Sequence, residues 1–316
     1  MRFVAADEIA ALLSFPTLVD ALAQAFRRPV VVPVRHHHAM ARPDGESMLL
    51  LMPAWTASGT EADMVGTKLV TVFPGNAARG LDTVTGLYVL MSGATGVPLA
   101  VLDGRALTLW RTAAASALAA RHLARADAGR LALIGAGSLA PYLARAHASV
   151  RPIRCVRIWN RTPARAQALA AVLAAEGFEA EAVATREEAI AGADIISSAT
   201  LSAQPLVEGR WLRPGQHVDL VGGFTPAMRE ADDEAIRRAR VYVDTRAGTL
   251  KEAGDIVEPI RTGALTAQGV QGDLFELEAG TAQGRGAADE ITLFKSVGTA
   301  IEDLAAAELV WQRLGG

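Results

Sequence analysis

The stretch LALIGAGSLAPYLARAHASVRPIRCVRIWNRT, residues 131–162, decides the fold of this chain. It begins with a short apolar run, Leu131–Ile134, as expected of a strand that is covered on both faces in a parallel sheet. A glycine turn at 135–140 matches the pattern G-x-G-x-x-A, and a small-residue helix and a second strand, Cys155–Trp159, follow it. This order predicts a Rossmann-type dinucleotide site, the alternative being an ordinary strand-to-helix turn.

The residues of the glycine turn have separate physical roles. Gly135 allows the tight turn, Gly137 lets a pyrophosphate approach the backbone, and Ala140 allows close packing of the helix. The helix that starts here points its free N–H groups at the phosphates. We therefore predict that Gly135, Gly137, Ser138, Leu139 and Ala140 bind the dinucleotide.

The end of the second strand indicates which dinucleotide is bound. The adenosine ribose lies there, and sites that select NAD usually carry Asp or Glu to bind the 2′-hydroxyl. This chain has Asn160, Arg161 and Thr162 instead, and a guanidinium can pair with a 2′-phosphate through two hydrogen bonds. We predict NADP(H) as the preferred cofactor, with NAD(H) as the alternative. In the competing interpretation Arg161 is only a solvated residue at a helix start, because Thr162-Pro163 is typical of an N-cap followed by proline.

Length and composition favour a metabolic protein with two domains. The 316 residues include 51% hydrophobic residues, and the net charge of −3 shows no bias toward nucleic acid or acidic membranes. We see neither a signal peptide nor a run of about 18 apolar residues that would predict a membrane span. The single cysteine, Cys155, cannot form a disulfide within the chain and is expected in the core rather than as a nucleophile. A reducing cytoplasm is the compartment we expect.

The part of the chain before the glycine turn predicts helices followed by a sheet. Helical spacing of apolar residues indicates helices at Asp7–Leu13 and Pro16–Phe26. From Val30 the pattern changes to extended segments separated by Gly, Pro, Asn and Asp turns, which predicts a mostly antiparallel sheet. These segments are Val30–Met40, Ser47–Met52, Met64–Phe73, Val84–Met91 and Val97–Leu102.

Three basic residues stand out in this first part. They are Arg35 on the first predicted strand, Lys68 within the apolar strand MVGTKLVTVF, and Arg111 at the expected start of the helix WRTAAASALAARHLA. Burial of a lysine costs free energy unless an anion pairs with it, so Lys68 is either an edge residue or a substrate contact. A cation at a helix start opposes the helix dipole, which predicts an anionic partner for Arg111, such as a phosphate or a carboxylate.

The run His36-His37-His38 raises the question of a metal site. Neighbouring residues of a strand point to opposite faces, so only His36 and His38 can converge. No nearby Cys, Asp or Glu completes a ligand set, and we predict no metal. One of these imidazoles could still touch substrate.

After the second strand, helices and strands continue to alternate. The strands Asp194–Ala199 and His217–Val221 lead into the loops Ser198-Ala199-Thr200 and Gly222–Pro226. Ligands of open α/β sheets bind at the carboxyl ends of the strands, so these two loops should flank the nicotinamide.

The last segment, Ile291–Leu314, has helical spacing and predicts one long helix. Such a helix lies beyond the last strand of the expected sheet and should pack back on the N-terminal domain. We therefore predict an α/β fold in which a Rossmann domain, residues 113–290, is inserted in a discontinuous α+β domain, residues 1–112 plus 291–316.

Six motifs together resemble the ornithine cyclodeaminase/mu-crystallin family, and they occur in consistent order over nearly the whole chain. They stand here as Gly66-Thr67-Lys68-Leu69-Val70, Arg111-Thr112-Ala113-Ala114-Ala115-Ser116, Gly135–Ala140, Trp159-Asn160-Arg161-Thr162, Val221-Gly222-Gly223 and Leu293-Phe294-Lys295-Ser296-Val297-Gly298.

The resemblance implies a homodimer built through the N-terminal domain and a site for an amino or imino acid. It implies that Arg35, Lys68 and Arg111 bind the carboxylate of that substrate, which is a role suited to cationic side chains. It also places Ser296 and Gly298 near the nicotinamide. The full set of dinucleotide contacts expected from motif and resemblance is Thr112, Gly135, Gly137, Ser138, Leu139, Ala140, Asn160, Arg161, Thr162, Ala199, Thr200, Val221, Phe224, Ser296 and Gly298.

Two departures from the family pattern bear on the reaction. Members with cyclodeaminase activity carry an aspartate after Val-Gly-Gly, where this chain has Phe224, and a glutamate before Met-Pro, where it has Leu51. A phenylalanine cannot accept a proton, so ornithine deamination is not expected.

The sequence around Phe224 instead resembles bacterial reductases of cyclic ketimines, which convert Δ1-pyrroline-2-carboxylate and Δ1-piperideine-2-carboxylate to proline and pipecolate. Lys68 would then be a catalytic residue as well as a carboxylate contact, and Thr225 or a water would supply the proton to the imine nitrogen. Ornithine cyclodeaminase, an amino-acid dehydrogenase of the same family, and a crystallin-like protein that only holds NADPH are the alternatives.

Overall fold

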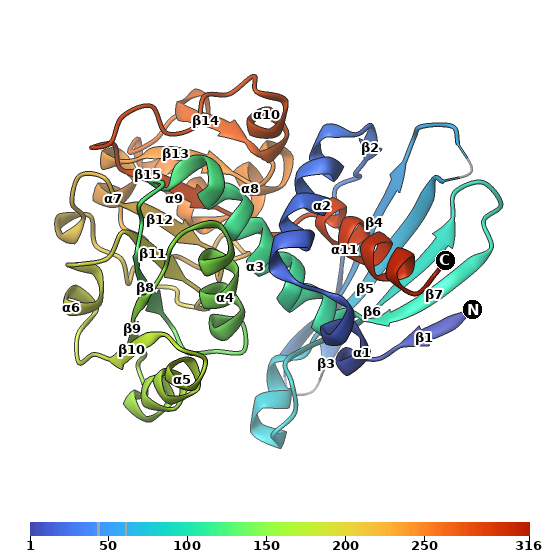
Figure 1. Ribbon diagram of the computed structural model, residues 1–316, viewed down its shortest axis with the longest axis horizontal. Helices are drawn as coiled ribbons and strands as arrows, with labels where there is room; N and C mark the ends of the chain where they lie inside the picture. Colours follow the sequence, from blue (N-terminus) through green and yellow to red (C-terminus); the bar gives the residue numbers. More distant parts are fainter. Residues whose placement is uncertain (43–44, 61) are drawn as a thin grey trace. The chain divides into compact units, whose positions relative to one another are not determined.

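The chain forms two units, and the second interrupts the first in sequence (Figure 1). The structure is a computed structural model, and it describes residues 1–42, 45–60 and 62–316. Unit 1 comprises Met1–Thr112 and Thr299–Gly316, and unit 2 comprises Ala113–Gly298. Segments at the two ends of the chain therefore share one unit.

Unit 1 is a sheet with helices packed on it. Its strands are β1 (Arg2–Val4), β2 (Val30–Val31), β3 (His36–Arg42), β4 (Gly45–Thr56), β5 (Met64–Val72), β6 (Val84–Ser92) and β7 (Pro98–Asp103). Its helices are α1 (Ala6–Leu12), α2 (Phe15–Arg27), the 3-10 helix η1 (Pro74–Arg79), the first part of α3 (Gly104–Leu123) and α11 (Ala300–Arg313).

The strands of unit 1 follow the order β1-β7-β6-β5-β4-β2, and β3 pairs with β4. Most pairs are antiparallel, as predicted, and β1 pairs with β7 in parallel. The C-terminal helix α11 packs on β4, β5 and β6 and lies beside α2 (Figure 1).

Side chains alternate across this sheet, so each strand has a buried and a more exposed face. On β5 the buried face carries Gly66, Lys68 and Val70, while Leu69 between them is exposed. A Cβ atom on Gly66 would lie 1.8 Å from the hydroxyl of the buried Tyr88, so only glycine leaves room for that ring.

Unit 2 alternates strands with helices. Its strands are β8 (Arg130–Ile134), β9 (Cys155–Trp159), β10 (Glu179–Ala182), β11 (Ile195–Ser198), β12 (His217–Leu220), β13 (Arg240–Val243), β14 (Val270–Asp273) and β15 (Thr292–Lys295). Its helices are the rest of α3, α4 (Ala140–Val150), α5 (Pro163–Ala175), α6 (Arg186–Ile190), η2 (Gly209–Trp211), α7 (Asp233–Arg238), α8 (Arg246–Glu252), α9 (Gly254–Thr262), η3 (Ala267–Gly269) and α10 (Leu274–Ala279).

The strands of unit 2 form one parallel sheet in the order β10-β9-β8-β11-β12-β15-β13-β14. The chain order reverses between β8 and β11, and this is the point at which ligands bind in open α/β sheets. Leu131–Ile134 are at most 1% exposed, so the apolar run is the central, fully covered strand that the sequence predicted.

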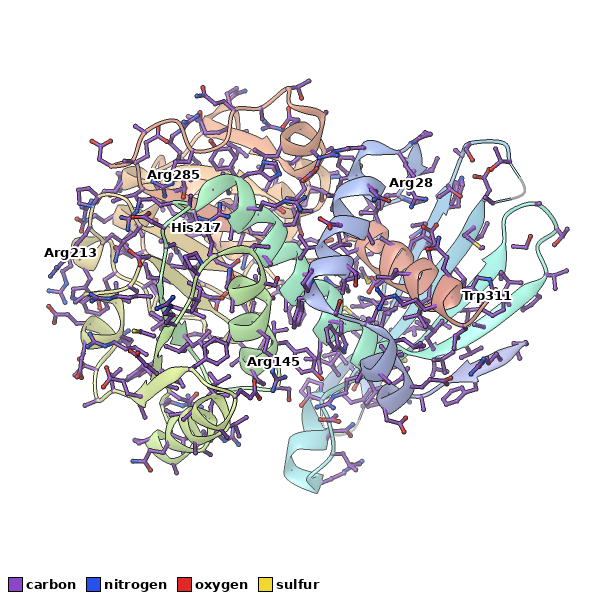
Figure 2. All side chains as sticks on the ribbon, in the orientation of Figure 1. Arg28, Arg145, Arg213, His217, Arg285 and Trp311 are labelled. Carbon is purple, nitrogen blue, oxygen red and sulfur yellow. The ribbon has the colours of Figure 1, made fainter. Side chains whose placement is uncertain are left out.

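Buried polar groups also link strands of this sheet. The hydroxyl of Thr292 on β15 lies 3.0 Å from Nδ1 of His217 on β12 and accepts a hydrogen bond from Arg285. Figure 2 labels His217 and Arg285. Burial lowers the pKa of His217 to about 3, so this imidazole stays neutral in the core.

Two of the predicted elements are wrong. The segment 30–40 is not one strand, because residues 32–35 separate β2 from β3, and Arg35 therefore precedes a strand. The helix predicted for 291–314 is instead the strand β15 followed by α11, so residues 291–298 belong to unit 2. Periodicity cannot distinguish a short buried strand from a helix segment, which explains the second error.

The described residues contain no single helix with the length and apolar composition of a membrane span. The pair α1 and α2, bent by 87°, would meet that criterion only when both helices are counted together.

Candidate functional site

The basic residues of unit 1 converge on one buried carboxylate. Lys68 and Arg111 are 2% and 5% exposed. Lys68 Nζ lies 2.8 Å from Asp303 Oδ2, and Arg111 Nε donates to Asp303 Oδ1 at 3.0 Å. Asp303, in the first turn of α11, thus joins two cations that are far apart in the sequence.

A second carboxylate from the same helix completes the pairing. Arg111 Nη1 donates to Glu302 Oε2 at 2.6 Å, and both Glu302 and Asp303 are fully buried. These two residues were not predicted from the sequence. Their signal was a pair of adjacent acidic residues in a helix whose other positions are mostly apolar, since a buried charge needs a partner.

The sequence predicted an anionic partner for Arg111, but for a wrong reason. The helix α3 begins at Gly104, so Arg111 lies within the helix and not at its start. The cost of burying a guanidinium, rather than the helix dipole, explains why it needs carboxylates nearby.

Charges around Lys68 change its protonation. Burial, together with the positive charges of Arg111 and Arg35, lowers the pKa of Lys68 to about 8, while Asp303 opposes this decrease. Arg35 therefore lies near enough to Lys68 for its charge to act on the ammonium group.

In unit 2, the turn after β8 has the geometry that a dinucleotide requires. Gly135 has φ of 109°, a conformation that side chains disfavour, and its amide donates to the carbonyl of Trp159. A Cβ atom on Gly137 would meet no atom within 4 Å, so space is open over the backbone there, and α4 begins at Ala140. A pyrophosphate fits this open turn and helix N-terminus.

The end of β9 places its predicted residues beside that turn. Asn160 Oδ1 accepts a hydrogen bond from the Ala136 amide at 3.1 Å, so Asn160 fixes the glycine turn. Arg161 and Thr162 are exposed, and α5 starts at Pro163 with Thr162 as its N-cap residue. The Thr162 side chain makes no capping hydrogen bond, which leaves its hydroxyl available to a ligand.

The loops at the carboxyl ends of β11 and β12 touch each other. A Cβ atom on Gly222 would lie 2.1 Å from the backbone nitrogen and oxygen of Thr200, so glycine is required at this contact. Val221 and Thr225 are half-buried, and Phe224 packs against the apolar core of unit 2.

A buried carboxylate holds the last predicted residues. Asp244 Oδ2 accepts hydrogen bonds from the Ser296 hydroxyl and from the amides of Val297 and Gly298, at 2.7–3.1 Å. Gly298 has φ of 80°, which explains the glycine of this motif. The predicted site residues thus form two groups, with Arg35, Lys68, Arg111 and Thr112 in unit 1 and all others in unit 2.

The described residues contain no group of three or more His, Cys, Asp and Glu side chains that could hold a metal ion. His36, His37 and His38 are exposed, and the rings of His36 and His38 lie on the same face with their centroids 6.4 Å apart.

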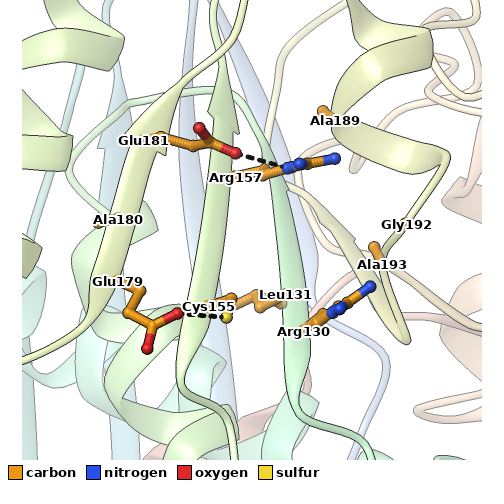
Figure 3. A pocket seen from close by; sticks show the side chains of 10 residues that line it. All are labelled: Arg130, Leu131, Cys155, Arg157, Glu179, Ala180, Glu181, Ala189, Gly192 and Ala193. Atoms are coloured by element: carbon orange, nitrogen blue, oxygen red, sulfur yellow. Dashed lines mark hydrogen bonds and ion pairs between the residues drawn. The ribbon is translucent and has the colours of Figure 1, made fainter.

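A hollow of about 470 Å³ lies over the first residues of β8, β9 and β10 (Figure 3). Cys155 lines it, so this half-buried thiol is not in the core as predicted. The thiol donates to Glu179 at 2.9 Å, and this bond raises the pKa of Cys155 and keeps it protonated. The hollow is at the opposite end of β8 from the glycine turn and is not the dinucleotide site.

The family is decided by a match over almost the entire sequence. The model of the ornithine cyclodeaminase/mu-crystallin family matches residues 2–316. The chain belongs to this family. The resemblance drawn from the six motifs is confirmed.

Similar proteins of the family include two reductases. The Δ1-pyrroline-2-carboxylate reductase of Paracoccus denitrificans (strain Pd 1222) is 40% identical, with 94% of this chain and 96% of the relative covered. The Δ1-pyrroline-2-carboxylate reductase of Colwellia psychrerythraea is 37% identical, with 99% of each chain covered.

Solved structures of similar proteins contain nicotinamide dinucleotides. Δ1-Pyrroline-2-carboxylate reductase of Thermococcus litoralis, in complex with NADH and L-proline, is 32% identical with a TM-score of 0.93, over 99% of this chain and 97% of that chain. An archaeal alanine dehydrogenase dimer with bound NAD is 30% identical with a TM-score of 0.90, over 99% and 95%. The iminosuccinate reductase of Paracoccus denitrificans with NAD⁺ is 30% identical with a TM-score of 0.89, over 100% and 96%. The predicted fold class is confirmed.

The ion pairs of α11 generate a prediction about stability. Replacing Asp303 by Asn leaves Lys68 and Arg111 buried side by side without their shared carboxylate, and loss of one partner of a buried pair costs about 3–5 kcal/mol. Urea unfolding followed by tryptophan fluorescence should show a loss of this size.

The matched control is Glu8→Gln in α1 of the same unit. Glu8 pairs with Arg2, and their side chains are 32% and 48% exposed, so this change should cost at most about 1 kcal/mol. Equal unfolding midpoints for the two variants would contradict the role given to Asp303.

Proposed function

We propose that this protein is an NAD(P)H-dependent reductase of cyclic ketimines, acting on Δ1-pyrroline-2-carboxylate and Δ1-piperideine-2-carboxylate to give proline and pipecolate. The observation that carries the proposal is the pair of buried cations Lys68 and Arg111, with Arg35 near enough to lower the pKa of Lys68, because cationic side chains of this kind suit a substrate carboxylate. The reductases among its relatives, at 37–40% identity over nearly full length, support the same reaction.

A nicotinamide dinucleotide is the cofactor that the similar structures support. In this chain the turn at Gly135–Ala140, the residues Asn160–Thr162 and the loops after β11, β12 and β15 would hold it. When bound, the nicotinamide supplies the hydride that reduces the C=N bond.

The chain itself has two tasks in this reaction. Lys68, Arg111 and Arg35 hold the carboxylate and thereby orient the adjacent ring carbon, which is already electrophilic in the protonated imine. The proton on nitrogen comes from solvent or from Thr225, whose backbone carbonyl is fixed by the amides of Met228 and Gly254 at 3.1 and 3.2 Å. The apolar Phe224 offers no base for ammonia release, which argues against a cyclodeaminase.

The first test is the reaction itself. Wild-type protein should oxidise NADPH with the five- and six-membered cyclic ketimines, and Lys68→Met should lower kcat/KM by a factor of about 100 or more, because a buried charge-assisted bond to the carboxylate is lost. Binding of NADPH, followed by quenching of its fluorescence, should be retained in this variant.

The control for the lysine is Lys251→Met, since Lys251 is exposed in unit 2 and should leave turnover unchanged. Ammonia release from ornithine with NAD⁺, without ketimine reduction, would identify a cyclodeaminase instead. NADPH binding without any turnover would favour the crystallin-like alternative.

We further propose that NADPH is preferred over NADH. The support is the exposed Arg161 at the end of β9 and the absence of a carboxylate among Asn160, Arg161 and Thr162. Replacing Arg161 by Ala should raise the KM for NADPH about tenfold or more and leave that for NADH nearly unchanged, because only the 2′-phosphate is lost as a partner.

Arg165→Ala, an exposed arginine one turn later in α5, is the control and should alter neither KM. Equal use of NADPH and NADH by the wild type, with no effect of Arg161→Ala, would rule out the preference.

We also propose a homodimer formed through the open face of the unit 1 sheet. Leu51, Leu69 and Leu87 lie in register on β4, β5 and β6, on the face opposite Lys68, and Leu69 and Leu87 are 37% and 44% exposed. A row of apolar side chains on an uncovered sheet face is typical of an interface between subunits. The archaeal alanine dehydrogenase with a similar structure is a dimer.

The double variant Leu69→Asp/Leu87→Asp should therefore be a monomer, while the wild type has twice the chain mass in light scattering after size exclusion. Val172→Asp changes an apolar residue of α5 in unit 2 that is 48% exposed, and it should remain dimeric. A monomeric wild type would refute this proposal without affecting the proposed reaction.

A further inference from the structure

Glu230 lies at the centre of the loops that follow β11 and β12. It is fully buried, and its two carboxylate oxygens accept five hydrogen bonds. Oε1 accepts from the Ser198 hydroxyl at 2.7 Å, from the Thr200 amide at 2.8 Å and from the Thr200 hydroxyl at 3.0 Å. Oε2 accepts from the amides of Gly222 and Gly223 at 2.8 and 3.1 Å.

These hydrogen bonds join the loop after β11 to the loop after β12, and the loop after β11 also contacts the glycine turn after β8. Thr200 lies directly against Gly222, and its Cγ2 would be 3.0 Å from a Cβ atom on Gly135 in the pyrophosphate turn. A shift of the loop at Thr200 would therefore disturb both neighbours. Three of the five donors are backbone amides, so Glu230 fixes the orientation of the peptide groups at Thr200, Gly222 and Gly223.

Two further buried residues hold Glu230 in place and balance its charge. Lys295, at the end of β15, lies 3.7 Å from Glu230 Oε2 and 3.0 Å from Asp255 Oδ2, and all three side chains are 0% exposed. Asp255 Oδ1 accepts from the amides of Glu230 and Ala231 at 2.7 and 2.9 Å. Burial raises the pKa of Glu230, while Lys295 and the donors from Ser198 and Thr200 oppose that rise.

A purely structural role explains this arrangement less well. A buried carboxylate with a buried lysine is costly compared with apolar side chains of the same volume, and a stable sheet does not require it. Five donors converge on Glu230 at the point where the two loops expected to flank the nicotinamide meet.

We propose that Glu230 is a positioning residue, which fixes the loops after β11 and β12 in the conformation that receives the nicotinamide half of the dinucleotide, with Lys295 and Asp255 holding it in place. This inference rests on the dinucleotide site of the proposed function, but not on the identity of the imino acid. Glu230 acts through Thr200, Gly222 and Gly223 and does not itself take part in proton or hydride transfer.

The test is Glu230→Gln, which keeps the shape but turns one acceptor oxygen into a donor that faces donors. NADPH affinity, measured by fluorescence quenching without imino acid, should weaken about tenfold or more, as expected when hydrogen bonds to a charged group are lost. The KM for the ketimine should stay unchanged because its carboxylate is assigned to unit 1, and kcat should fall. Hydrogen exchange should accelerate at the amides of Thr200, Gly222 and Gly223 and not throughout unit 2.

Glu176→Gln is the matched control, since Glu176 pairs with Arg145 at the surface of unit 2 and should leave all of these values unchanged. A folded Glu230→Gln protein with wild-type NADPH affinity and unchanged exchange at the three amides would overturn the proposal.

If Glu230→Gln does not fold, Ser198→Ala removes only one of the five hydrogen bonds. It should weaken NADPH binding by about twofold to tenfold, in keeping with the loss of one such bond. Unchanged affinity in that variant would overturn the proposal. Weaker NADPH binding together with no ketimine turnover in the wild type would uphold the role of Glu230 and reject the substrate.

Discussion

The ion pair between Lys68 and Asp303 is the constraint on which the arrangement of the chain depends. Lys68 lies on the buried face of an apolar strand, where an isolated ammonium group would not be tolerated. Its carboxylate partner is 235 residues later, in the first turn of the last helix. The chain leaves the sheet of unit 2 after β15 and returns to unit 1, where α11 places Asp303 beside Lys68.

Unit 2 also contains buried carboxylates, and there they hold loops in place. Two of its buried carboxylates, Glu230 and Asp244, accept hydrogen bonds mainly from backbone amides of loops. Parallel strands end at the same edge of a sheet, but their loops have no ladder partners beyond that edge. A carboxylate with two acceptor oxygens can take several of these amides at once, which gives the loops a defined conformation before any ligand arrives.

The sequence predicted those elements that are determined by neighbouring residues. Two strands, Leu131–Ile134 and Cys155–Trp159, appear as predicted on either side of the glycine turn and its helix. The turn requires glycine because Gly135 has a positive φ of 109°. Lys68 and Arg111 were singled out as unusual charges, and both contact the carboxylate of Asp303. The partners Glu302, Asp303, Glu230 and Lys295 were not predicted, because the charged side chains that pair with them lie far away in the sequence.

The predicted long C-terminal helix failed for a related reason. Phe294 and Val297 continue the apolar spacing of α11, yet β15 lies between β12 and β13 and is covered on both faces. All four residues of β15 are buried, including Thr292 and Lys295, so the strand shows no alternation of buried and exposed positions that would separate it from the start of a helix. The pairing that decides between them involves strands about 50 and 75 residues away, at Arg240–Val243 and His217–Leu220.

The proposed reduction requires fewer functional groups from the protein than deamination would. A cyclic ketimine already has its electrophilic carbon, so the site has to hold a carboxylate, orient the ring and admit one proton. Loss of ammonia would additionally need a base that accepts a proton from substrate or water, and the corresponding loop of this chain carries Phe224, which packs against the core. In the proposed reaction Lys68 and Arg111 would bind the carboxylate, and a phenylalanine in place of a base favours addition to C=N over elimination of an amine.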